Sequence, residues 1–125
     1  MIPAVRAFVT ELGSDDLACC DRAGLADRFT AVREAKSALA AYEAELVVAV
    51  DRLDDRGLDG AGMLRVQGRM SSKAAARTAR TAARLEEMPR TAEALAGGRI
   101  TAEHAATLAD AAEVLDPQVV DEELV

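Results

Sequence analysis

Six basic side chains between residues 65 and 84 form the group in this sequence that is best suited to do chemistry. This cationic row consists of Arg65, Arg69, Lys73, Arg77, Arg80 and Arg84. Successive members lie three or four positions apart, which is the spacing of side chains on one face of a helix. The stretch between Asp59 and Glu86 contains no acidic residue. A row of cations without interleaved acids is suited to an anionic partner, such as a nucleic-acid phosphate backbone.

The charge of the rest of the chain leaves two interpretations of this row open. The chain carries a net charge of -7, with -5 in residues 1–60, +5 in residues 61–100 and -7 in residues 101–125. The row could follow the phosphates of double-stranded DNA without reading its sequence. It could instead pair internally with the acidic flanks. The acids available for such pairing are Asp51, Asp54, Asp55, Asp59, Glu103, Asp110 and Glu113.

The helix boundaries divide the row. Over the helix predicted for residues 72–87, the four cations from Lys73 to Arg84 fall within about 60° of one another at 100° per residue. The opposite side of this helix is small and apolar, and it carries Ala75, Ala79, Ala82 and Leu85. Gly68 and Ser71 interrupt the helical register, so Arg65 and Arg69 belong to the preceding helix.

The other reactive residue types do not form a catalytic pattern. Cys19 and Cys20 are adjacent, where a disulfide would be strained. A redox switch or a metal clamp is one interpretation of the pair, but we favour two small apolar side chains on a short helix. His104 is the only histidine and has no cysteine near it in the sequence, which argues against a zinc site, and the sequence shows no Ser–His–Asp order with supporting motifs. We therefore expect no enzyme activity, no metal and no cofactor.

Two common modes of nucleic-acid reading are excluded by the composition. Residues 91–115 have the outline of a helix-turn-helix, but the second helix carries Glu103, Asp110 and Glu113 and no Lys or Arg. Phosphates would repel such a reading helix. The scarcity of aromatic residues, with only Phe8, Phe29 and Tyr42, argues against base stacking. No apolar run is long enough to span a membrane and the N-terminus lacks a secretory pattern, so we expect a cytoplasmic protein.

The elements that must position these residues read as helices throughout. We predict an all-α fold, a multi-helix array in a single domain over residues 1–125. Its long helix, at about residues 27–56, would pack against shorter helices. Val32, Leu39, Leu46 and Leu53 are seven residues apart, and Ala35, Tyr42 and Ala49 fill the seam between them. This heptad pattern requires a partner helix. We favour packing inside the chain's own domain over a dimeric coiled coil.

Start and stop signals delimit the shorter helices. A first helix should run from Pro3 to about Leu12, and a second from Ser14 until Gly24 ends it. Further helices are expected at residues 61–67, 72–87 with Ser71 as the N-cap, and 89–96. Ile100, Thr101 and Ala105 have the spacing of a hydrophobic staple for a helix that reaches Leu115. The start of another helix is expected at residues 118–125.

Motif residues in the second half of the chain resemble a known family. The residues that follow its pattern are Arg69-Met70-Ser71, Ala75, Arg77, Arg80, Ala82, Leu85, Met88-Pro89, Thr91-Ala92, Ala94 to Thr101 and His104-Ala105. The pattern resembles the domain of unknown function 222 (DUF222) family of actinobacteria, also called the 13E12-repeat family. The resemblance covers about residues 41–115. Its most specific part here has Met88 and Thr101 where the family has Leu and Ser.

In that family the helical domain is commonly followed by an HNH nuclease module. Such a module needs two histidines and usually an asparagine around a metal, and this sequence has one His and no Asn. The resemblance therefore implies an incomplete, non-catalytic N-terminal part of a DUF222-like domain that is accessory to a DNA-acting protein. The expected partners are double-stranded DNA, without sequence preference, and a partner helix or a missing C-terminal segment. The alternative is a protein–protein interaction or oligomerisation module with the cationic row paired internally.

Overall fold

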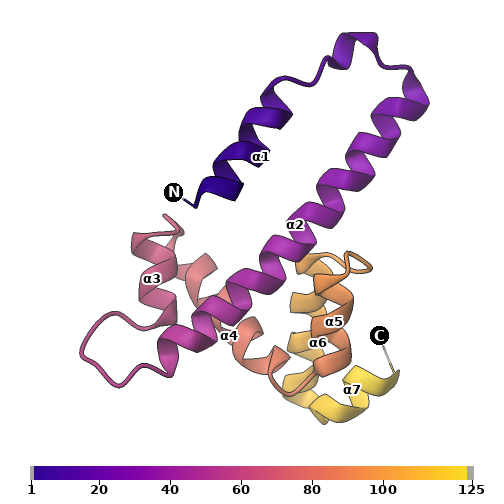
Figure 1. The fold of residues 1–125 in the computed structure, drawn as a ribbon. Coiled ribbons are helices and arrows are strands. Elements are labelled where there is room, and N and C mark those ends of the chain that lie inside the picture. Colours follow the sequence, from indigo (N-terminus) through magenta and orange to yellow (C-terminus); the bar gives the residue numbers. More distant parts are fainter. Residues whose placement is uncertain (1, 124–125) are drawn as a thin grey trace. The chain divides into compact units, whose positions relative to one another are not determined.

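The structure, a computed structural model that describes residues 2–123, is all-α as the sequence predicts (Figure 1). Its helices are α1 (Pro3–Gly13), α2 (Arg22–Asp51), α3 (Gly60–Val66), α4 (Ser72–Leu85), α5 (Pro89–Ala96), α6 (Ala102–Val114) and α7 (Pro117–Glu123), with a short 3-10 helix at Leu17–Cys19. The described residues contain no strand. The chain divides into two compact units, residues 1–31 and residues 32–125, and α2 runs through both.

The first unit has little interior of its own. Neither α1 nor the 3-10 helix contains a buried residue. An ion pair joins the turn after α1 to the start of α2, because Arg28 Nε donates to Asp15 Oδ2 at 2.6 Å and Arg28 Nη2 donates to Asp15 Oδ1 at 3.0 Å. The Arg28 side chain holds the pKa of Asp15 below its usual value through this hydrogen bond.

The long helix begins and ends about five residues earlier than the sequence indicated. Asp21 Oδ1 accepts the Gly24 N–H at 2.7 Å, so Gly24 lies in the first turn of α2 rather than at the end of a preceding helix. The helix predicted from Ser14 to Gly24 is therefore wrong, and only the 3-10 turn forms there. At the other end, Asp51 closes the helix and Leu53 lies beyond it.

The face of α2 that packs against the shorter helices is the opposite of the predicted seam. The contacts in the second unit are made by Ser37, Ala40, Ala41, Ala44, Val47 and Val48. The heptad residues Val32, Leu39 and Leu46 are 44%, 60% and 47% exposed, and Tyr42 is 52% exposed. Packing of the seam inside the chain's own domain is thus wrong for the described residues. Small side chains form the inner face because they let the neighbouring backbone come close.

Two glycines make these close approaches. A Cβ at Gly98 would lie 2.9 Å from Glu34 Cγ and 3.2 Å from Glu34 Cα, and Gly98 has a φ of +76°. A Cβ at Gly60 would lie 2.6 Å from Val47 Cγ1 and 2.9 Å from the Val47 carbonyl oxygen. The turn between α5 and α6 and the start of α3 are therefore each seated directly on α2, at points where only glycine fits without displacement.

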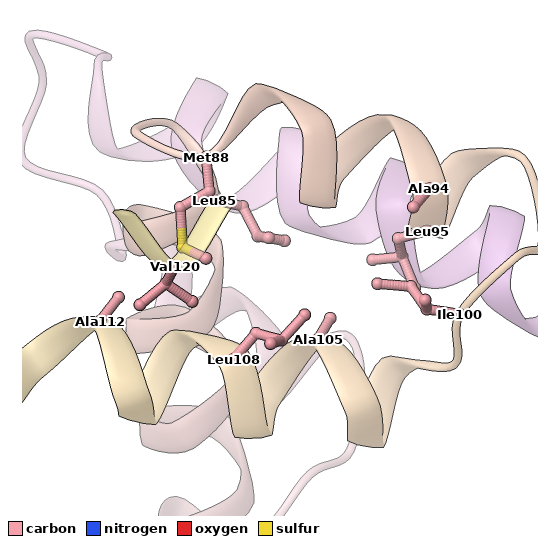
Figure 2. Close-up of a cluster of buried hydrophobic side chains, with 9 residues drawn as sticks. All are labelled: Leu85, Met88, Ala94, Leu95, Ile100, Ala105, Leu108, Ala112 and Val120. Carbon is pink, nitrogen blue, oxygen red and sulfur yellow. The ribbon is translucent and has the colours of Figure 1, made fainter. Parts of the chain in front are cut away.

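The main core lies among α4, α5, α6 and α7, with the alanines of α2 against it (Figure 2). Figure 2 shows Ala105, Leu108 and Ala112 of α6 pointing toward the α4–α5 junction. Met88, at that junction, and Val120 of α7 have no exposed surface. A second cluster joins Val47 of α2 to Leu64 of α3 and to Ala75 and Ala82 of α4. The helices that carry the cationic row are thus held in place from their inner side.

The helix caps of the second half agree with the sequence signals. Ser71 Oγ accepts from Ala74 N at 3.1 Å, Thr101 Oγ1 accepts from His104 N at 3.2 Å, and Ile100 and Ala105 are buried together in the main core. The start of α5 has no local side-chain cap. Its amides instead donate to Asp121 on α7: Thr91 N at 2.7 Å and Arg90 N at 3.1 Å, with the Thr91 hydroxyl at 2.8 Å. Asp121 itself is 4% exposed.

Candidate functional site

The outer side of α4 carries four members of the cationic row, which we call the α4 quartet: Lys73, Arg77, Arg80 and Arg84. The inner side is buried through Ala75, Ala82 and Leu85, and Ala79 is partly buried, as the sequence predicts. Lys73, Arg77 and Arg80 are exposed and Arg84 is half-buried. Because the inner side is fixed in the core, the quartet is presented on a helix whose rotation is set.

Two of the four cations have ionic partners. Arg77 Nη2 lies 3.5 Å from Asp110 Oδ2 on α6, and Arg84 Nη1 lies 3.1 Å from Glu87 Oε2. Both pairs are solvent-exposed, and such pairs contribute about 0–1 kcal/mol each. Among residues 2–123, Lys73 and Arg80 form no ion pair. Internal pairing therefore accounts for half of the quartet, through weak contacts.

Most of the acids that the sequence offered for internal pairing form no ion pair with the row in the described residues, and two of them accept hydrogen bonds from backbone amides instead. Asp51 Oδ1 accepts the Gly60 N–H at 2.7 Å, and Asp59 Oδ1 accepts the Gly62 N–H at 2.7 Å. These two carboxylates hold the first turn of α3, where negative charge also suits the helix dipole. Of the seven candidate acids, Asp110 is the one that pairs with the row within the described part of the chain.

The other two members of the row lie on and after α3, which packs against α4. Arg65 occupies the last turn of α3 and is exposed. Arg69 is also exposed, and it has a φ of 55°, a left-handed conformation more usual for glycine. Met70 N donates to the Leu64 carbonyl at 3.0 Å across this turn. All six cations therefore lie on α3, on α4 or in the turn that joins them, from Arg65 to Arg84.

Further contacts at this segment have no signal in the sequence. Arg52, just after α2, lies 3.3 Å from Glu86 at the end of α4, and Glu87 pairs with Arg84, so both exposed carboxylates form ion pairs. A groove of about 250 Å³ lies between α2, α4 and α5. Alanines line much of it because their short side chains leave the space unfilled, and Glu45 and Glu86 line it as well. These carboxylates make the groove a poor site for an anion.

Cys19 and His104 each form a hydrogen bond with a residue three positions earlier in the chain. Cys19 donates its S–H to Asp16 Oδ2 at 3.0 Å, and this hydrogen bond raises the pKa of the Cys19 thiol. A raised pKa lowers the thiolate fraction and makes the residue less reactive. His104 is exposed in the first turn of α6. Within residues 2–123 no group of three or more His, Cys, Asp or Glu side chains has an arrangement that could hold a metal ion.

None of the described helices is both long enough and apolar enough to cross a membrane. In comparisons with known proteins, no family model, no curated protein and no solved structure matches this chain. The DUF222 resemblance therefore rests on the motif residues alone.

Proposed function

We propose that this chain is a non-catalytic helical module whose cationic row contacts the phosphates of double-stranded DNA without reading the sequence. The observation that carries the proposal is the α4 quartet, with Lys73, Arg77 and Arg80 exposed on a helix whose opposite side is buried in the core. In the terms of the family resemblance, the module would be a DUF222-like domain accessory to an HNH-type DNA-acting protein.

The positions of the cations support a role other than folding. Lys73 lies in the first turn of α4, where the helix dipole disfavours positive charge. Like charges three or four residues apart also destabilise a helix, by about 0.2–0.5 kcal/mol for each pair. The ion pairs to Asp110 and Glu87 do not offset this for Lys73 and Arg80. An anionic partner that spans the row would.

The acidic faces of the molecule restrict how DNA could approach. Glu103, Asp110 and Glu113 are exposed on α6. A duplex would therefore contact Lys73 and Arg80 of α4 and the α3–α4 turn, and at Arg77 its phosphates would compete with Asp110, which lies 3.5 Å away. Binding of this kind neutralises phosphates and releases counterions, so its affinity falls as the salt concentration rises.

Titration of a DNA duplex at a series of salt concentrations tests the proposal. The test variant is Lys73→Glu/Arg80→Glu, which reverses the two α4 cations that lack an ion pair. The matched control is Arg6→Glu/Arg56→Glu, which changes the net charge equally at exposed positions outside the row. For the test variant we expect weaker binding, and a slope of log K against log salt that is less steep by about 0.9 for each phosphate that the variant no longer neutralises.

Besides a failure of the wild-type chain to bind DNA, two results would overturn the proposal. One is wild-type binding that does not respond to salt. The other is an equal decrease of DNA affinity in the test and control variants, which would reduce the effect to net charge. If the wild-type chain does not bind DNA at all, the internally paired interaction module is the better interpretation.

A further inference from the structure

An ordered apolar surface runs along the outer side of α2. We call it the α2 stripe: Val32, Ala35, Leu39, Tyr42, Leu46 and Ala49. Its large members are between 44% and 60% exposed. At 3.6 residues per turn, the stripe lies on nearly the opposite side of the helix from Ser37, Ala41 and Ala44, which face the core. The packing of the second unit therefore leaves the stripe uncovered.

The spacing of the stripe distinguishes it from scattered surface residues. Apolar side chains that repeat every three and four residues form the seam of a two-stranded coiled coil, in which each knob enters a hole on a partner helix. Isolated apolar side chains on a surface need no explanation, but a contiguous line of them marks an interaction site. The partner that fits such a seam is another helix with the same repeat.

We infer that the stripe is the interface of an antiparallel homodimer, in which α2 of one copy packs against α2 of a second copy. The two-fold axis would lie between the two α2 helices, at the level midway between residues 40 and 41. In this register Leu39 faces Tyr42 of the partner subunit. Ala35 faces Leu46 of the partner subunit, and Val32 faces Ala49 of the partner subunit. The two outer layers each combine a larger side chain with an alanine, and the layer next to the axis combines Leu39 with Tyr42. The side-chain volumes are therefore balanced along the seam.

Charges beside the stripe favour the same register. Lys36 and Glu43 lie along one edge of it, seven residues apart, and neither forms an ion pair within the described residues. In the antiparallel arrangement Lys36 comes beside Glu43 of the partner subunit, once on each side of the two-fold axis. Two symmetric ion pairs form, and such flanking charges set the orientation of helix pairs.

A parallel pairing of the same helices fits less well. It would place Ala35 against its own copy, Tyr42 against its own copy and Ala49 against its own copy, so under-filled layers would alternate with an over-filled one. The residue that would then lie beside Glu43 is Ala38 of the partner subunit, which offers no opposite charge. Both volume and charge therefore select the antiparallel pair.

The seam is about three heptads long, which is short for peptides that must fold as they associate. Here α2 is already folded, because its inner face is held by the core clusters of the second unit. Association then costs no helix formation, and the stripe is presented ready for contact. The inference is independent of DNA binding, since none of its residues belongs to the cationic row.

Sedimentation of the purified chain over a range of concentrations is the first test. Wild type should reach twice the 13.2 kDa monomer mass, and Leu39→Asp/Leu46→Asp should remain monomeric. Because both leucines are exposed, the variant should keep the helical circular dichroism of wild type. The matched control, Val66→Asp/Val114→Asp, changes residues that are 55% and 87% exposed away from the stripe and should still dimerise.

The charges and a crosslink test the register. Lys36→Glu alone should weaken the dimer, and adding Glu43→Lys should restore it. In a background with Cys19→Ser and Cys20→Ser, a mixture of Val32→Cys and Ala49→Cys chains should oxidise to a mixed disulfide. Neither chain should crosslink to itself, since two copies of residue 32 would lie about 25 Å apart at 1.5 Å per residue.

Several outcomes would overturn the inference. A wild-type chain that stays monomeric up to its solubility limit would mean that something other than a second copy covers the stripe. A dimer that survives Leu39→Asp/Leu46→Asp would use a different surface. Self-crosslinking of the Val32→Cys chain would show a parallel pair and exclude the antiparallel register.

Discussion

At the scale of single residues, Asp121 joins two helices through one buried carboxylate. It accepts three hydrogen bonds from Arg90 and Thr91 at the start of α5, where Pro89 has no N–H to offer and no local side chain caps the helix. Charged hydrogen bonds in a buried site are stronger than exposed ones, and their removal leaves the amides without partners.

Replacement of this carboxylate should therefore be costly. We expect Asp121→Ala to lower the free energy of unfolding by about 2–3 kcal/mol. The neighbouring Glu122→Ala, at an exposed position of the same helix, is the control and should change it little. Urea unfolding followed by circular dichroism measures both. A similar decrease in the two variants would contradict the role assigned to Asp121.

This residue also shows where sequence-based prediction ends. Ser71 and Thr101 could be predicted as N-caps because the amides they bind are three residues away. Asp121 lies 30 residues from Thr91, so no local pattern joins them. The sequence likewise predicted that the six cations form a row, but it did not predict which of them form ion pairs. The contact between Arg77 and Asp110 depends on how α4 packs against α6.

At the scale of elements, the turn between α5 and α6 depends on one of its two adjacent glycines. Gly98 has a positive φ and touches the backbone of α2, whereas Gly97 has a φ of -83° and is exposed. We expect Gly98→Ala to destabilise the fold by about 1–3 kcal/mol, and Gly97→Ala to have a clearly smaller effect.

Thermal or urea unfolding of the two alanine variants measures this difference. Equal effects would mean that general backbone flexibility matters here and that the contact with Glu34 does not. The sequence predicted that this helix ends at residue 96, directly before the two glycines, and the structure confirms it. The sequence provided no means of ranking the two glycines, because the approach to α2 is a tertiary contact.

The long helix illustrates the same limit. Periodicity and charge identified a helix in this region, and the structure confirms it with shifted ends. The larger apolar residues were assigned to the packed face because they follow a heptad pattern. The structure buries the alanine face instead, since close helix packing in this chain relies on small side chains. Choosing between two apolar faces of one helix requires the neighbouring elements.

At the scale of the whole molecule, the two units should differ in stability. Among residues 2–123, the buried residues belong to the second unit, while α1 and the 3-10 helix have none. Local opening is easiest where few apolar contacts must be broken. We expect amide hydrogen exchange to be slow in α4 and α6 and fast in α1. Uniform protection across the chain would contradict this division.

The ion pair between Asp15 and Arg28 gives the first unit a pH dependence. Because the folded pKa of Asp15 is lowered, its stabilisation is complete above the ordinary value of 3.8 and is lost as the pH falls through the lowered pKa. Asp15→Asn should therefore increase exchange in residues 15–31 at neutral pH and make no difference in acid. Glu11→Gln, which removes a carboxylate that forms no ion pair with any other residue from 2 to 123, is the control. A deficit in the Asp15 variant that persists in acid would contradict the assignment.

The two glycine contacts on α2 fix the distance along that helix between the α5–α6 turn and the start of α3. Gly98 contacts Glu34 and Gly60 contacts Val47, and the 13 residue steps from Glu34 to Val47 span about 20 Å at 1.5 Å per residue. Insertion of a single residue between these contacts would rotate one contact by about 100° relative to the other. Homologous chains that keep both glycines should therefore keep this interval at a constant length, whatever side chains occupy it, while the helix outside the interval is free to lengthen or shorten.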